Sequence, residues 1–224
     1  MLSLSGPWMR LGAVLSALIV VMTVIGLTMH RDFYAGRKRQ DFFCFYTNVS
    51  NTAVLVYFSL CAPRLYATSS LHPVIPHAEF AVMMCIMLTC CVFHLALYPA
   101  IRMAALHMPR TQAYYIVYTD NLIIHYLVPL TVLLYWLLCS PHKHRLSAAD
   151  ALYWTGLPLA YIAWIFYRAG KKRIIKETAS LYPYPFLDVG ALGARRVLCL
   201  CTGLYILCIL AGFLIIVLVH WTGA

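Results

Sequence analysis

Six apolar segments of about 20 residues each constrain the fold more than any other feature of the sequence. They cover residues 11–29, 43–62, 80–98, 118–139, 149–167 and 197–219. A helix needs about 20 apolar residues to cross the hydrocarbon core of a bilayer. Backbone groups in lipid must bond within the segment, and these segments lack the alternation of barrel strands. The sequence therefore predicts an all-α integral membrane protein, a single domain over residues 1–224 built as a bundle of six transmembrane helices.

The composition agrees with this fold class. Hydrophobic residues make up 63% of the chain and charged residues only 11%, whereas soluble domains carry about 25% charged residues. The net charge of +10 is expected in a membrane protein, because Lys and Arg collect in cytoplasmic loops. The expected partners are thus membrane lipids and not nucleic acid.

The distribution of Lys and Arg predicts the orientation. Loops 30–42, 99–117 and 168–196 together hold 13 of these residues, and the opposite side holds 4. The positive-inside rule therefore places these three loops in the cytoplasm and both termini outside.

The loop before the last predicted span has two parts. Residues 168–176 form a basic run that suits anionic headgroups. Residues 181–190 read LYPYPFLDVG, in which two X-Pro units favour an extended path and three aromatic residues supply apolar surface. This second part is predicted to be a re-entrant or interfacial loop.

Polar residues converge in one layer just inside the predicted cytoplasmic interface. A rise of 1.5 Å per residue places Thr47 about 6 Å and His125 about 10 Å into their spans. The same layer holds His94, Asp120, Asn121 and Asp188. Ionisable residues within spans usually face the bundle interior and often mark function.

Spacing along two of the spans groups these side chains on single faces. Asn121, His125 and Pro129 recur at every fourth position of one span. On another span, Thr47 and Asn51 have the same spacing, with Ser50 beside them. The expected lining of the resulting pocket includes Ser50, His94, Pro129 and Tyr184.

A histidine within reach of a hydroxyl is the minimum for an activated nucleophile, so Thr47 and His125 are the candidate catalytic pair. Candidate donors to an oxyanion, or supporting residues, are Asn48, Asn51 and Asn121. Asp120 or Asp188 could orient the histidine, and the sequence does not choose between them. No cofactor is expected, and no cysteine or histidine spacing indicates a metal site.

Each of these residues also has a purely structural interpretation. Thr47 could bond back to its own helix, as Ser and Thr do in membrane spans. The Asn residues could join neighbouring helices, and His125 could be a satisfied buried histidine. Asp120 and Asp188 both precede apolar runs and could be helix N-caps.

Three sequence blocks resemble a known family. They are FYTNVSN at 45–51, DNLIIHYLVPL at 120–130 and YPYPFLDVGALG at 182–193. In this order, within six apolar segments, they resemble the Pr-six-Pr membrane proteins, which are related to the androgen-induced-protein superfamily of multipass threonine hydrolases. The animal members cleave fatty-acid esters of hydroxy fatty acids. The resemblance implies a threonine nucleophile at Thr47, a histidine base at His125 and a lipid-like ester substrate.

A second function class remains open from the sequence. The polar layer could instead be a substrate or proton path of a transporter or small-molecule-binding membrane protein, with His94, Asp120 and His125 as its relay. The sequence shows no obvious internal repeat of the kind that many transporters carry. The leading hypothesis is therefore an intramembrane hydrolase of lipid acyl esters.

Overall fold

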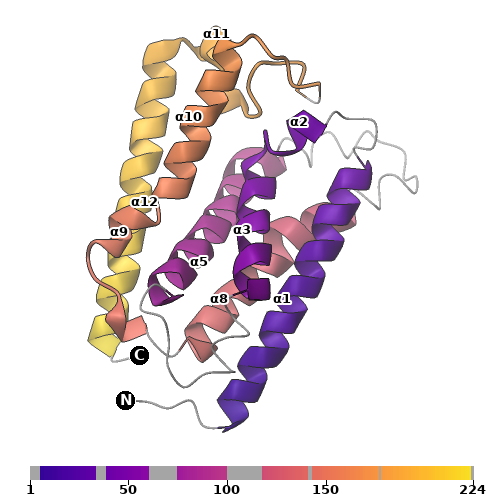
Figure 1. Ribbon diagram of the computed structural model, residues 1–224. Helices are drawn as coiled ribbons and strands as arrows, with labels where there is room; N and C mark the ends of the chain where they lie inside the picture. The colour runs from indigo at the N-terminus through magenta and orange to yellow at the C-terminus, as the bar shows by residue number, and fades with distance from the viewer. Residues whose placement is uncertain are drawn as a thin grey trace.

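The computed structural model describes residues 6–33, 39–60, 75–99, 118–140, 143–176 and 178–222. These residues are mostly helical (Figure 1), and within the described ranges the only β pairing is an isolated bridge between Ile175 and Ser180. The all-α class predicted from the sequence is confirmed.

Four helices are long and apolar enough to cross a membrane, as expected of a multi-pass membrane protein. The first candidate span, Arg10–His30, lies in α1 (Gly6–Phe33), and the second, Pro76–Leu97, consists of most of α5 (Ile75–Val92) and its extension η1 (Phe93–Leu97). The third, Tyr118–Cys139, contains η2 (Ile123–Leu127) and α8 (Val128–Cys139). The fourth is the whole of α12 (Ala194–Thr222). Their positions agree with four of the six predicted spans.

The two other predicted spans correspond to shorter helices. Both α3 (Tyr46–Leu60) and α10 (Gly156–Gly170) have 15 residues. At 1.5 Å per residue each is about 22 Å long, which is less than the roughly 30 Å of a hydrocarbon core. A membrane crossing by α3 and α10 therefore stays a prediction.

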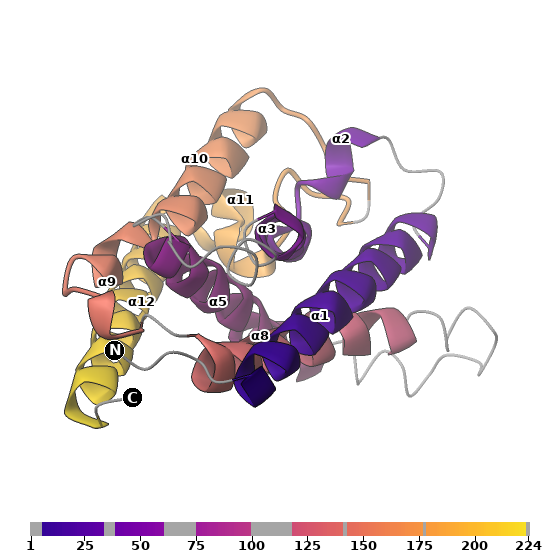
Figure 2. The ribbon, with the colours of Figure 1, turned by 60° about the horizontal axis from the view of Figure 1, so that its bottom comes forward.

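Four helices form the core of the bundle. The neighbours of α1 are α3 and α8, and the same two helices pack against α5. Figure 2 shows these helices side by side, viewed from the end at which α1 begins. Fully buried side chains from three of them, Phe58, Phe80 and Tyr135, fill the space between the axes.

A second layer, made of α9 (Asp150–Tyr153), α10 and α12, lies beside the α5 side of the core (Figures 1 and 2). In α12 the buried residues Cys208, Gly212, Ile216 and Val219 recur every three or four positions, so one stripe faces the protein. At Gly212 the fit is tight, because a Cβ there would lie 2.6 Å from Trp154 Nε1. The lower half of α12 is therefore held closely against α9.

Two of the four long spans change their backbone pattern near the polar layer. The segments η1 and η2 are π-helical turns, in which Tyr98 N donates to Phe93 O and Val128 N donates to Ile123 O. Such single π turns occur often at functional sites. These two turns contain His94 and His125, respectively.

The segment between α10 and α12 covers the upper end of the bundle in Figure 1. It contains η4 (Pro185–Leu187) and α11 (Val189–Leu192). Its buried residues Tyr184 and Leu187 pack in a cluster with Tyr46 and Tyr161. This apolar packing on α3 and α10 accounts for the aromatic residues, and the predicted re-entry into the membrane stays a prediction.

A buried ion pair connects the short helix α2 (Arg39–Phe42) to α10 at the same end. Arg168 Nη2 donates to Asp41 Oδ1 at 2.7 Å, and both residues are buried. The second guanidinium nitrogen of Arg168 donates to the backbone carbonyl of Arg173. The chain segments before α3 and after α10 are thereby joined beside the polar layer.

Candidate active site

The side chains of Thr47 and His125 meet inside the protein. Thr47 lies in the first turn of α3 and His125 in the π turn η2, and Thr47 Oγ1 is 3.1 Å from His125 Nε2. Both residues are buried. This separation lies within the range for a hydroxyl nucleophile and its base.

The partner of the second ring nitrogen indicates the tautomer of His125. Nδ1 lies 3.2 Å from the backbone carbonyl oxygen of Asn121. A carbonyl oxygen can only accept a hydrogen bond, so Nδ1 carries the proton and Nε2 has a free lone pair. The geometry therefore has the Thr47 hydroxyl donating to Nε2, the arrangement that general-base catalysis needs.

Thr47 differs from several other threonines of the described helices. Thr23, Thr52 and Thr131 each donate to the carbonyl four residues earlier in their own helix, which is the usual structural role of threonine in membrane helices. Thr47 lies in the first helical turn, and its hydroxyl bonds His125 instead. The back-bonded interpretation of Thr47 does not describe this structure.

Two packing contacts fix the position of the His125 ring. Phe93 of η1 stacks on the imidazole, with 3.7 Å between the ring centroids and 22° between the planes. In the same π turn, Ile123 and Ile124 lie so close to Gly26 of α1 that a Cβ there would overlap them. The absence of a side chain at Gly26 thus lets α1 pack directly on the turn that carries His125.

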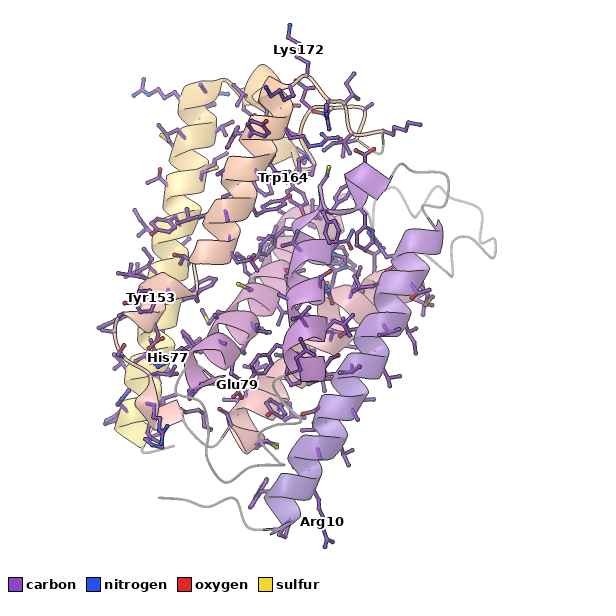
Figure 3. All side chains as sticks on the ribbon, viewed as in Figure 1. Arg10, His77, Glu79, Tyr153, Trp164 and Lys172 are labelled. Carbon is purple, nitrogen blue, oxygen red and sulfur yellow. The ribbon has the colours of Figure 1, made fainter. Side chains whose placement is uncertain are left out.

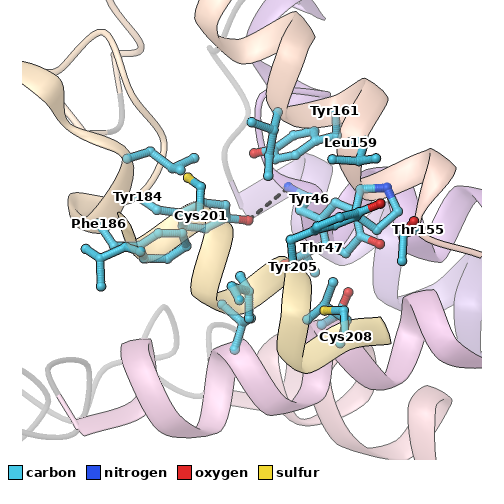
Figure 4. A pocket seen from close by; sticks show the side chains of 18 of the residues that line it. Tyr46, Thr47, Thr155, Leu159, Tyr161, Tyr184, Phe186, Cys201, Tyr205 and Cys208 are labelled. Carbon is cyan, nitrogen blue, oxygen red and sulfur yellow. Dashed lines mark hydrogen bonds between the residues drawn. The ribbon is translucent and has the colours of Figure 1, made fainter. Parts of the chain in front are cut away.

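The N-terminus of α3 contacts a phenol from the α10–α12 segment. Tyr46 N donates to the Tyr184 hydroxyl at 2.9 Å (Figure 4). The Tyr184 phenol also interacts with Thr47 and Tyr161. Burial raises the pKa of Tyr184, so its oxygen is protonated at neutral pH and can donate one hydrogen bond next to Thr47.

A cavity of about 220 Å³ lies between the core and the second layer, and Thr47 is part of its wall (Figure 4). The lining is mainly apolar and comes from α3, α5, η1, α10, η4 and α12; it includes Leu88, Val92, Phe93, Leu97, Pro158, Leu159, Ile162, Leu187, Leu200 and Leu204. Two of these residues, Leu159 and Leu200, are also exposed on the outside of α10 and α12. The cavity wall therefore reaches the surface of the protein.

The side-chain amide nitrogens of the two asparagines in α3 donate hydrogen bonds to backbone carbonyls. Asn48 Nδ2 donates to Phe42 O, and Asn51 Nδ2 donates to the carbonyls of Thr47 and Ile124. Neither residue is part of the cavity wall. The oxyanion role suggested for Asn48 and Asn51 is therefore not supported by this geometry, which matches their alternative role in joining helices.

Neither candidate carboxylate bonds His125. Asp120 Oδ2 lies 2.9 Å from His30 Nδ1, and both residues are buried. Asp188 accepts hydrogen bonds from Ala191 N and Ser180 Oγ, so it is the N-cap of α11. The N-cap interpretation of Asp188 is confirmed. A backbone carbonyl, that of Asn121, bonds Nδ1 of His125 in place of either carboxylate.

The other residues expected around the pocket fall in several places. Ser50 is buried and bonds Thr89 Oγ1 at 2.6 Å, joining α3 to α5. Pro129 is buried in α8. His94 is exposed and bonds the hydroxyl of Tyr126. Of these four expected pocket residues, only Tyr184 lines the cavity. Among the described residues, no hydrogen bond connects His94, Asp120 and His125 to one another as the relay hypothesis requires.

The structure also identifies contacts that the sequence reasoning did not. Phe93 covers the His125 ring, His30 pairs with Asp120, and Tyr46 lines the cavity next to the nucleophile candidate. His30 directly follows the predicted span 11–29, so its position beside the polar layer is a signal that the sequence contains. Phe93 and Tyr46 had no signal beyond their apolar surroundings.

No family model, curated protein or solved structure matches this chain. The functional argument therefore depends on the geometry and chemistry of the site.

Proposed function

We propose that the protein is an intramembrane hydrolase of lipid acyl esters, with Thr47 as nucleophile and His125 as general base. The observation that carries this proposal is the 3.1 Å contact between Thr47 Oγ1 and His125 Nε2 at the wall of an apolar cavity. Hydroxyl and imidazole groups are common in proteins, but their pairing beside an apolar cavity matches the needs of acyl transfer.

The proposed reaction has two steps. Thr47 Oγ1 attacks the ester carbonyl carbon while His125 Nε2 takes the hydroxyl proton. The bond from this carbon to the alcohol oxygen then breaks, and the alcohol leaves with the proton from Nε2, which produces an acyl-threonine. Water attacks this acyl group with His125 as base, and the carboxylic acid is released as Thr47 regains its proton.

The phenol of Tyr184 suits the role of oxyanion donor. Its oxygen accepts the N–H of Tyr46, and the phenol proton, which lies among Thr47 and Tyr161 in the resting site, would turn toward a negative charge that develops next to Thr47. Such a donor acts on the transition state more than on the substrate. Tyr184 replaces the asparagines of α3 in this role.

The cavity favours a lipid substrate. Its wall is mainly leucine, valine and aromatic side chains, and Leu159 and Leu200 lie at its boundary with the lipid-facing surface. An acyl chain can enter such a space from the bilayer, whereas a charged soluble ester would have to leave water. The fatty-acid esters of hydroxy fatty acids implied by the family resemblance belong to this substrate class.

A six-span topology is part of the proposal. The first turn of α1 and the last turn of α12 lie at one end of the bundle, and the basic residues around Lys172 lie at the other (Figures 1 and 3). If α3 and α10 cross the membrane as well, the positive-inside rule places the Lys172 end and the Thr47–His125 pair on the cytoplasmic side. Both termini are then outside.

Purified protein in detergent micelles tests the reaction. We expect hydrolysis of long-chain p-nitrophenyl esters and covalent labelling by a fluorophosphonate probe, with the label located on Thr47 by mass spectrometry. Thr47→Ala and His125→Ala should each lower kcat/KM by at least about 10³-fold, because removal of one member of a nucleophile–base pair disables the unit.

Thr52→Val is the matched control, since Thr52 lies on the same helix and bonds only its own helix carbonyl. It should hydrolyse and label like the wild type. Full hydrolysis and labelling by the Thr47→Ala or His125→Ala protein would reject the mechanism.

A further inference from the structure

Two arginines in the first turn of α12 lie beside the cavity whose wall contains Thr47. Arg195 and Arg196 are exposed. Together with Cys199 and Leu200 they form the described lining of an open hollow of about 450 Å³. Leu200 is also part of the cavity wall, and it follows Arg196 by about one helical turn. The hollow and the cavity therefore share a wall residue directly below the arginines.

The shared wall lies at the end of the cavity that contains the reactive pair. Cys201, the residue after the shared leucine, packs against the cluster that contains Tyr46 and Tyr184. The Tyr184 hydroxyl accepts the N–H of Tyr46 and interacts with Thr47. Figure 4 shows Cys201 and Tyr184 on the same side of the cavity. A group held in the hollow is thus at the Thr47 end of the cavity.

The positive charges of the two arginines have no acidic partner among the described residues. Each carboxylate that the structure describes bonds another group: Asp41 bonds Arg168, Glu79 bonds Tyr57, Asp120 bonds His30, Asp150 bonds His77 and Asp188 bonds Ser180. A guanidinium presents a planar set of N–H donors that matches the oxygens of a phosphate or carboxylate. Two of them beside one hollow are therefore suited to an anionic ligand.

A phosphate monoester fits this pair better than a carboxylate. It has a charge of about −1.5 to −2 at pH 7 and three strong acceptor oxygens, which match two guanidinium groups, whereas a carboxylate has a single charge. Cys199 and Leu200 follow Arg195 and Arg196 at four-residue spacing, so each pair shares a face of the helix. The hollow thus combines a cationic upper part with a less polar lower part that leads to the cavity.

We propose that Arg195 and Arg196 bind a phosphate group of the substrate, so that the protein takes acyl esters whose alcohol part bears a phosphate, as in a monoacylglycerol phosphate. This inference rests on the proposed function, because the ester beside the phosphate has to reach Thr47. The acyl chain then passes Leu200 into the apolar cavity, while the glycerol phosphate stays in the hollow. An ester with an uncharged alcohol gains nothing from the arginines and binds more weakly.

Binding without turnover tests this proposal. The Thr47→Ala protein, in micelles of an uncharged detergent, is titrated with 1-oleoylglycerol 3-phosphate and with 1-oleoylglycerol, each displacing an uncharged fluorescent fatty-acid ester. The phosphate ester should bind about tenfold more tightly, the effect of two solvent-screened, charge-assisted contacts. Addition of Arg195→Gln and Arg196→Gln should remove that preference. An oleoyl ester of a hydroxy acid, which offers a carboxylate, should bind less tightly than the phosphate ester.

Lys172→Gln with Lys176→Gln is the matched control. These two exposed lysines lie at the same end of the bundle and outside the described lining of the hollow (Figure 3), so their replacement removes the same charge. The control protein should keep the preference for the phosphate ester. An equal loss in the control would mean that net charge alone attracts the lipid, and it would overturn the proposal.

Three other results would also overturn it. They are equal binding of the phosphate ester and the uncharged ester, a preference that survives the two arginine substitutions, and binding of the carboxylate ester that is at least as tight. Equally effective competition by glycerol 3-phosphate, which has no acyl chain, would show that the cavity does not contribute. Because no hydrolysis is measured, these outcomes are separate from a failure of Thr47 to act as a nucleophile.

Discussion

Two buried polar pairs lie near opposite ends of α3, and the one near its beginning borders the apolar cavity, which the other does not. Near its beginning Thr47 contacts His125 at 3.1 Å, and near its end Tyr57 donates to Glu79 Oε2 at the same distance. All four residues are buried. Ten residues, or about 15 Å of helix, separate the two hydroxyl-bearing side chains.

The difference between the pairs is the space beside them. Thr47 is part of the cavity wall, whereas Tyr57 belongs to the tightly packed core cluster and neither it nor Glu79 lines the cavity. Polar burial inside a membrane protein is therefore a weak indicator of a reactive site by itself. A substrate must also have room next to the oxygen, and this requirement favours the Thr47 end.

Removal of the Tyr184 hydroxyl should have the largest effect among the tests of this comparison. We expect Tyr184→Phe to lower kcat for long-chain esters by about 10²-fold, the usual cost of losing one oxyanion donor. KM should change little, because the donor acts on the transition state. Steady-state kinetics gives both constants. A large rise in KM with unchanged kcat would mean that Tyr184 binds the substrate and does not stabilise the oxyanion.

Filling the cavity should have a smaller and substrate-dependent effect. Leu204→Trp adds bulk to the wall contributed by α12. The kcat/KM for a palmitoyl ester should fall by about tenfold, while that for an acetyl ester should fall much less, because only a long chain needs the filled space. Leu207→Trp is the control, since Leu207 is exposed and outside the wall. An equal fall in kcat/KM for both esters would contradict the proposal that the long acyl chain occupies the cavity.

Substitution in the second polar pair should have the smallest effect on activity. Glu79→Gln keeps the side-chain shape and an oxygen that accepts from Tyr57. Hydrolysis should stay within about twofold of wild type, and the free energy of unfolding should change by about 1 kcal/mol. Parallel activity and thermal-unfolding measurements check this. A loss of activity comparable to that of His125→Ala would show that both ends of α3 take part in function.

Much of the layer of polar residues could be predicted from the sequence, because a helix rises by a fixed amount per residue. This regularity placed Thr47 and His125 at similar depths, and the structure brings them together. The four long spans followed from hydropathy for the same reason. The N-cap role of Asp188 was recognisable from its position before an apolar run.

Other parts of the site had no signal in the sequence. The partner of His125 Nδ1 is a backbone carbonyl, and every residue has one, so side-chain types could not identify it. The two π turns depend on tertiary packing, and hydropathy does not distinguish them from α-helix. Hydropathy also could not predict that α3 and α10 are short, because the apolar runs in the sequence continue past the ends of these helices.

The close contact between Gly212 and Trp154 has a kinetic consequence. It holds α12 against α9 at one end, while the segment from Leu200 to Cys208 stands beside the cavity. In the proposed hydrolase, substrate and product would then exchange sideways with the bilayer and need no route through bulk water. The rate of such an enzyme follows the mole fraction of ester in the micelle or membrane, and dilution with inert detergent at constant bulk ester concentration lowers it.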